Sequence, residues 1–241
     1  MALAQALKTN STLTTLSLEL NYIGYYGAEA LSKALMVNST LSALFLSRTE
    51  FGDFGVQDLA EALRTNSALR ILELRHNNIY EDGAQALAES LKINSVLTTL
   101  DLGNNSIGSN GAKALAEALR INSTLTHLEL AENEVLDDGA MALAEALKTN
   151  SVLTCLNLGG NSIESNGANA LANALITNTT LTALYLYNNS IGDIGSQSMC
   201  EAIQVNSTLT KLFVYQNLIG DIGGEAFSKL LKNNTALEIV Y

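Results

Sequence analysis

Three side chains in the middle of the chain are of the types that carry nucleophilic or metal chemistry. They are His127, Glu129 and Cys155. A cysteine beside a histidine and an acid can act as a nucleophile, and the same three groups can bind zinc. His127 and Cys155 lie 28 residues apart, so whether they meet depends on the elements that carry this spacing.

Two further sets of residues repeat at the same spacing and suggest recognition of a partner. One set is acidic, and the other is aromatic. Acids attract basic partners, and exposed tyrosines supply much of the binding energy at protein interfaces. The candidate binding residues are Phe45, Glu73, Asp101, Glu129, Tyr185, Tyr187, Phe213 and Tyr215.

The spacing of 28 residues runs through the whole chain. Leucine recurs in one column from Leu13 to Leu237, glycine recurs from Gly27 to Gly223, and asparagine closes each unit from Asn10 to Asn234. A fixed period of 20–50 residues is typical of a solenoid. We therefore predict a single repeat domain over residues 1–241, with a partial repeat at 1–12, eight repeats at 13–236 and a partial strand at 237–241.

Each repeat divides into a strand half and a helix half. The first half reads Leu-x-x-Leu-x-Leu-x-x-Asn, as in residues 97–105, and its period of two predicts a short strand. The second half reads Gly-Ala-x-Ala-Leu-Ala-x-Ala-Leu, as in residues 111–119, and predicts an amphipathic helix. The fold class is therefore an α/β solenoid. Helices are wider than the strand spacing, so we expect a horseshoe with a parallel sheet on the concave face and helices on the convex face.

Polar residues at fixed positions predict how the turns are satisfied. Asp82, Asn110, Asp138 and Asn166 precede the glycine column and are expected to cap helix N-termini, and the closing asparagine is expected to form a left-handed C-cap. A second asparagine column, which includes Asn77 and Asn105, follows the strands and is expected to bond the turns of its own and the next repeat. Thr49 interrupts that column, so we expect the second repeat to be looser.

The repeats resemble leucine-rich repeats of the ribonuclease-inhibitor type. The phrases Asn-Ser-Thr-Leu-Thr-x-Leu-x-Leu and Gly-Ala-x-Ala-Leu-Ala-x-Ala-Leu are most similar to the repeat domains of NOD-like receptors, and more distantly to the Ran GTPase-activating protein. The resemblance implies a horseshoe that binds proteins and is not an enzyme. The chain departs from these families because it has only two cysteines and no Gly-x-x-x-x-Gly-Lys-Ser/Thr motif.

Charge and composition narrow the classes of partner. The net charge is −11, which argues against nucleic acid or an anionic membrane as the main partner. No apolar run reaches the roughly 20 residues of a spanning helix, and the N-terminus lacks the pattern of a secretory signal. Together with the two cysteines, this predicts a cytoplasmic protein, with a bacterial effector acting in host cytoplasm as an alternative setting.

An open, water-exposed sheet offers the His127–Cys155 pair no oxyanion hole and no pocket. We therefore predict neither catalysis nor a cofactor or metal, and we expect His76 to be a surface residue. Bulky residues before the helices form another candidate surface on the rim; they are Tyr25, Tyr26, Phe54, Ile194 and Ile222.

The sequence thus predicts a non-enzymatic module that binds a protein partner, one with a basic surface, on its concave face. Two alternatives stay open at this point. One is regulation of a small GTPase. The other is a structural solenoid that self-associates through uncapped ends, because neither end carries a polar capping repeat.

Overall fold

Helices and strands alternate along residues 2–234 and 237–241, which are the residues that the computed structural model describes. The strands are β1 (Thr15–Ser17), β2 (Ala43–Phe45), β3 (Ile71–Glu73), β4 (Thr99–Asp101), β5 (His127–Glu129), β6 (Cys155–Asn157), β7 (Ala183–Tyr185), β8 (Lys211–Phe213) and β9 (Glu238–Val240). The helices are α1 (Ala2–Leu7), α2 (Gly24–Leu35), α3 (Gly52–Thr65), α4 (Glu81–Leu91), α5 (Gly108–Leu119), α6 (Leu136–Leu147), α7 (Ser165–Thr177), α8 (Gly192–Val205) and α9 (Asp221–Asn233).

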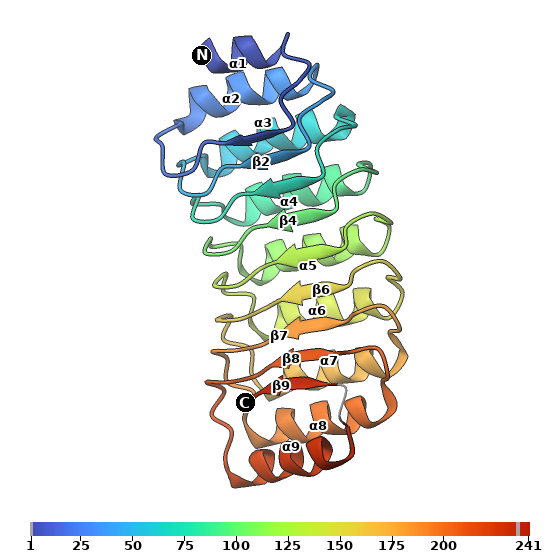
Figure 1. The fold of residues 1–241 in the computed structure, drawn as a ribbon. Helices are drawn as coiled ribbons and strands as arrows, with labels where there is room; N and C mark the ends of the chain where they lie inside the picture. The colour runs from blue at the N-terminus through green and yellow to red at the C-terminus, as the bar shows by residue number, and fades with distance from the viewer. Residues whose placement is uncertain (1, 235–236) are drawn as a thin grey trace.

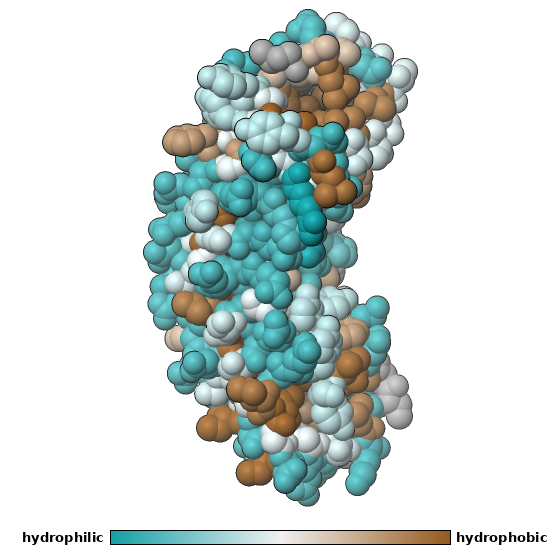
Figure 2. Space-filling view, turned by 90° about the vertical axis from the view of Figure 1, so that its left-hand side faces the viewer, coloured by the Kyte–Doolittle hydropathy of each residue, from teal (hydrophilic) through white to brown (hydrophobic). Residues whose placement is uncertain are grey.

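The strands form one parallel sheet in chain order, with each strand bonded to the next. From β1 to β8 the register is 28 residues, so residues that share a column in the sequence are neighbours in space. Figure 1 shows the strands in one layer and the helices in a layer behind them. Figure 2 shows the outline from the side, hollowed along the edge that carries the strands. The predicted α/β solenoid with a concave sheet is confirmed.

The core lies between the two layers and follows from the leucine and alanine columns. Leu44, Leu72 and Leu100 point inward from the strands and are fully buried. On the helix side, glycine lets neighbouring helices approach closely. A Cβ atom at Gly111 would lie 2.9 Å from the Cβ of Ala84 on the preceding helix, so larger residues would push the repeats apart.

The inner asparagine column forms a ladder that ties each repeat to the preceding one. The side-chain amide of Asn133 is fully buried and donates to the carbonyl of Leu102 at 2.9 Å, in the preceding repeat. Its Oδ1 accepts from the backbone N–H of Ile107, also in the preceding repeat. The predicted bonds within its own repeat are confirmed, because the amide also donates to the carbonyls of Leu130 and Ala131. The predicted bonds to the next repeat are wrong in direction, because the partners outside its own repeat lie one repeat earlier.

Thr49 keeps the ladder hydrogen-bonded by another route. Its fully buried hydroxyl donates to the Leu46 carbonyl at 2.6 Å and lies 2.9 Å from Oδ1 of Asn77. Its backbone carbonyl accepts the N–H groups of Ile23 and Gly24 in the first repeat. The expected loosening is therefore absent from the hydrogen bonding of these residues.

The closing asparagines are not left-handed C-caps. Asn66 has extended backbone angles (φ −69°, ψ 126°) and Asn178 has similar ones. The Asn66 amide donates to the Leu35 carbonyl, which ends the preceding helix, and its Oδ1 accepts from the N–H groups of Ala68 and Leu69. The side chain thus closes one helix and opens the next turn, which an extended backbone allows.

The residues predicted to cap helices lie within the first turns of α4 to α7, and no side-chain cap is formed there by the first residues outside these helices. The caps come instead from the preceding repeat. Oδ1 of Asp137 accepts from the N–H groups of Glu164 and Gly167 at the start of α7. Asp53 and Asp193 do the same for α4 and α9.

The last strand slips by one residue. Phe213 pairs with Val240 instead of Tyr241, which places Ile239 opposite Leu212 and against the core. Tyr241 therefore leaves the concave column in which its spacing from Phe213 had placed it. Its ring stacks on Phe227 of α9, with 5.1 Å between ring centroids.

The hydrogen bonds of the inner asparagine column predict that alanine substitutions in this column lower the free energy of unfolding by unequal amounts. Replacing Asn133 with alanine removes bonds to buried carbonyls of Leu102, Leu130 and Ala131, so we expect a loss of about 2–4 kcal/mol in the free energy of unfolding. Asn21→Ala is the matched control, because Asn21 is exposed at the first repeat and we expect it to cost under about 1 kcal/mol. Urea unfolding measures both losses of stability, and equal losses would contradict the role of the buried asparagine bonds.

The helix caps that one repeat supplies to the next predict that alanine substitutions at two neighbouring acids of α6 destabilise the protein by different amounts. Asp137→Ala should cost about 1 kcal/mol, because two N–H groups at the start of α7 lose their acceptor. Asp138→Ala should cost about half of that or less, since the interaction that Asp138 makes with the described residues is an exposed ion pair with Lys113. Thermal unfolding of the two variants tests this, and a larger loss from Asp138→Ala would count against the capping role.

Candidate functional site

The concave face carries the side chains that the strands do not bury. Strand alternation points the central leucines inward and leaves the flanking residues on the open side of the sheet. The register places Glu73, Asp101 and Glu129 next to one another, and places Asn157, Tyr185 and Phe213 in the repeats that follow. The predicted residues therefore share one face, with acids toward the N-terminal half and aromatic residues toward the C-terminal end.

Four aromatic side chains form two stacked pairs on this face, and we call them the aromatic ladder: Tyr185, Tyr187, Phe213 and Tyr215. Tyr185 and Phe213 stack with 4.9 Å between ring centroids and 13° between ring planes. Tyr187 and Tyr215 stack with 5.2 Å and 7°. All four are partly exposed, so they present a flat aromatic surface at repeats seven and eight.

The outer part of the Tyr187 ring lies directly over Gly159 in the preceding repeat. A Cβ atom at Gly159 would collide with the ring atoms Cζ, Cε1 and Cε2 of Tyr187. Glycine at this position is therefore what allows the ring to lie flat toward the sixth repeat.

The three acids differ in their surroundings. Asp101 is 8% exposed, accepts a hydrogen bond from the N–H of Gly103 and lies 3.6 Å from the guanidinium of Arg75. Glu129 accepts a hydrogen bond from the Asn157 side chain and has no ion pair among the residues that the structure describes. Burial raises the pKa of each of the three carboxyl groups, and repulsion between them raises the pKa of Glu73 and Glu129 further.

Phe45 stands apart from the aromatic ladder. It pairs in register with Ser17 and Glu73, and four repeats separate it from Tyr185. The structure thus does not bring this predicted residue together with the other aromatic residues. Arg75, in contrast, belongs to the acidic region as the partner of Asp101, although the sequence analysis had not assigned it a role.

The residues with nucleophilic potential are neighbours but are not arranged for reaction. His127 pairs in register with Cys155, yet its Nδ1 lies 2.9 Å from the hydroxyl of Thr126. The Cys155 thiol instead points to a Glu129 carboxylate oxygen at 3.9 Å. Burial and the Glu129 charge raise the pKa of Cys155 to about 11, so the thiol stays protonated at neutral pH.

Within the described residues, no group of three or more histidine, cysteine or acidic side chains is placed to hold a metal ion. The described helices also include none with the length and apolar character needed to cross a bilayer.

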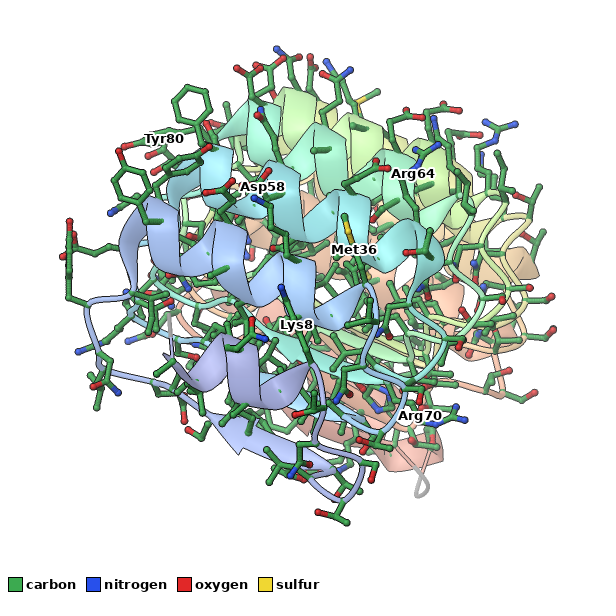
Figure 3. All side chains as sticks on the ribbon, turned by 90° about the horizontal axis from the view of Figure 1, so that it is seen from above. Lys8, Met36, Asp58, Arg64, Arg70 and Tyr80 are labelled. Carbon is green, nitrogen blue, oxygen red and sulfur yellow. The ribbon has the colours of Figure 1, made fainter. Side chains whose placement is uncertain are left out.

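The rim where strands end and helices begin carries another exposed aromatic cluster. The cluster extends beyond the predicted Tyr25, Tyr26 and Phe54 to Tyr22, which is 80% exposed, and to Tyr80. Tyr25 contacts Tyr26 and Phe54, and Figure 3 shows Tyr80 projecting outward at this edge. In Figure 2, apolar side chains gather at both ends of the molecule and polar ones occupy the middle.

Comparison with known proteins identifies the repeat. A leucine-rich repeat family model matches residues 9–32, 65–88 and 94–116. The chain is built of leucine-rich repeats. A second family model, described as the TMOD/LMOD leucine-rich domain, matches residues 112–216. This range includes all four residues of the aromatic ladder.

The solved structures that are similar to this chain include two that we describe by their overlap with it. One is the leiomodin-1 actin-binding site 2, with 28% identity, a TM-score of 0.54 and coverage of 64% of this chain and 88% of that one. The other is the tropomodulin C-terminal domain of Caenorhabditis elegans, with 12% identity, a TM-score of 0.48 and coverage of 72% and 89%. A search of curated proteins finds no match. The finer resemblance to ribonuclease-inhibitor, NOD-like receptor and Ran activator repeats stays a prediction.

The three neighbouring acids Glu73, Asp101 and Glu129 predict that the stability of the folded protein depends on pH. The raised pKa of Glu129 means that its charge destabilises the folded state at neutral pH, and that this cost disappears as pH falls below the usual glutamate pKa of about 4.3. Glu129→Gln should therefore stabilise the protein at pH 7 by about 0.5 kcal/mol and give no gain near pH 4. Urea unfolding at both pH values tests this, with Glu117→Gln on the exposed side of α5 as the control. A destabilised Glu129→Gln variant at pH 7 would contradict the account.

Proposed function

We propose that this chain is a non-enzymatic protein-binding module that uses the aromatic ladder on its concave face as its main contact surface. The observation that carries the proposal is the pair of aromatic stacks on an open sheet. Aromatic side chains that pack into no core and stay partly exposed are typical of interface hot spots.

The solenoid suits this function because its binding surface is ordered before the partner arrives. Each strand is bonded on both sides from β2 to β8, and the buried asparagines fix the turns that follow the strands. Little conformational entropy is therefore lost when a partner docks. The high pKa of Cys155, and the fact that His127 and Cys155 direct their polar atoms to Thr126 and Glu129 instead of to each other, support a binding role over a catalytic one.

Actin is the first partner to test. The support is the similarity to the leiomodin-1 actin-binding site 2, and the match of the TMOD/LMOD model to the part of the chain that holds the aromatic ladder. Regulation of a small GTPase and self-association through the ends are not favoured by these comparisons. The cytoplasmic setting stays an expectation.

The test compares the wild-type protein with two triple variants in actin binding. The ladder variant removes most of the aromatic ladder by replacing three residues with alanine: Tyr185, Phe213 and Tyr215. The rim variant removes a similar aromatic area from the rim by replacing three others with alanine: Tyr22, Phe54 and Tyr80. We expect the ladder variant to bind actin at least tenfold more weakly and the rim variant to change affinity less than twofold. Co-sedimentation with filaments and anisotropy with labelled monomer measure the two forms of actin.

Two outcomes would count against the proposal in different ways. If the wild-type protein binds neither form of actin, actin is not the partner, and capture from a lysate with the same variants then tests the ladder alone. If a partner binds the ladder variant as tightly as the wild-type protein, the concave-face assignment is wrong.

A further inference from the structure

Glu129 is a partly buried carboxylate that forms no ion pair with a described residue, although the more distant charge of Arg75 attracts it. Its neighbour Asp101 has Arg75 at 3.6 Å, whereas Glu129 has only the Asn157 amide and the Cys155 thiol. A carboxylate that is shielded from water and unpaired gains free energy when a cation reaches it. Within the described residues, no cationic side chain forms an ion pair with it.

The surface beside Glu129 is lined by small residues in one column. Gly103, Ala131 and Gly159 occupy the third position after three successive strand centres, and all three are buried against the sheet. Arg75 leans over Gly103 at one end, where its Cζ would lie 3.1 Å from an added Cβ, and Tyr187 covers Gly159 at the other. No long side chain from this column therefore stands between Arg75 and Tyr187.

The dimensions of this stretch match a long basic side chain. Glu129 and the tyrosines of the seventh repeat are two repeats apart, or about 10 Å at the usual strand spacing. Lysine and arginine carry apolar stems that pack along apolar surface while the charged group reaches a polar site. A stem on the Tyr185 and Tyr187 rings would leave its charge at Glu129, and the same rings attract cations.

We propose that the concave face holds a subsite for a lysine or arginine side chain of a protein partner, formed by Glu129, Asn157, Gly159 and the rings of Tyr185 and Tyr187. This inference rests on the proposed function, because it names the chemistry of the partner at the same face. Charge complementarity selects the occupant, because the chain carries a net charge of −11. Among the described residues, Glu73 and Glu129 are the acids of this column that form no ion pair, and Glu129 lies nearer to the tyrosines of the seventh repeat. Arg75 pairs with Asp101, so the unpaired carboxylate of Glu129 is the one that offers an incoming cation a direct ion pair beside the tyrosines.

The test uses a labelled hexa-arginine peptide as the probe and a hexa-glutamate peptide as its charge-reversed control. Binding is measured by anisotropy at about 150 mM salt, which screens contacts with distant charges. Glu129→Gln should weaken binding at least fivefold, and Glu117→Gln, which removes the same charge from α5, should weaken it less than twofold. Gly159→Ala should also weaken binding, because its Cβ would displace the Tyr187 ring.

Amide chemical shifts locate the probe on the same samples. We expect the largest changes at residues 127–131, 157–159 and 185–187. Equal effects of Glu129→Gln and Glu117→Gln, shifts confined to the helices, binding of hexa-glutamate with similar affinity, or no binding of hexa-arginine would each overturn the subsite. An unchanged Gly159→Ala variant would remove Tyr187 from it and would also contradict the proposal.

This result is separable from that of the proposed function. If Glu129→Gln keeps full affinity for a protein partner that the ladder variant has lost, the basic subsite is wrong and the binding module stands. If the ladder variant keeps its affinity for that partner, the proposed function fails whatever the peptide does.

Discussion

The buried asparagine amides are the interaction on which the rest of this structure depends. Each repeat must turn sharply from strand to helix, and the turn leaves backbone groups facing the interior. The Asn161 amide, for example, donates to the Leu130 carbonyl of the preceding repeat and accepts from the N–H groups of Asn133 and Val135. An unpaired buried backbone group is costly, so the amide makes the turn possible and fixes the distance between repeats. The constant register of the strands, and with it the even spacing of residues on the concave face, follows from that constraint.

The regular spacing of the concave face comes from the buried asparagines that connect the repeats. Its chemistry comes from strand side chains that take no part in those hydrogen bonds. Glu129 and Tyr185 occupy the same strand position in repeats five and seven, so their relation is set by repeat spacing and not by local packing. This separation between scaffold and surface explains how acids can sit side by side despite their repulsion. The leucines below them are fully buried and hold the strands in place.

Much of the fold could be predicted because the period never changes between Leu13 and Leu209. The strand register and the position of each concave residue follow from counting, and the structure bears them out up to β8. The failures have one physical cause, which is contact between repeats. Asp137 caps the helix of the following repeat, and Asn66 closes the helix of the preceding one. Reading each repeat as a unit hides such contacts.

The details of the candidate site show the same limit. Counting placed Tyr187 on the concave face, but it could not show that the ring leans over Gly159 or that Arg75 takes Asp101 as its partner. Side-chain direction depends on the size of the neighbour one repeat away. The slip of β9 places Ile239 against the core and moves Tyr241 onto Phe227, and the constant period gives no sign of it.

A protein partner should dock on the concave face near the C-terminal end of the sheet. The most direct measurement places a photo-crosslinking residue at Lys211, which is exposed on β8 beside Phe213, and separately at Tyr26 on the rim, and illuminates each protein with actin. We expect a cross-link to actin from position 211 and none from position 26. A cross-link from position 26 alone would contradict it and would move the binding surface to the rim.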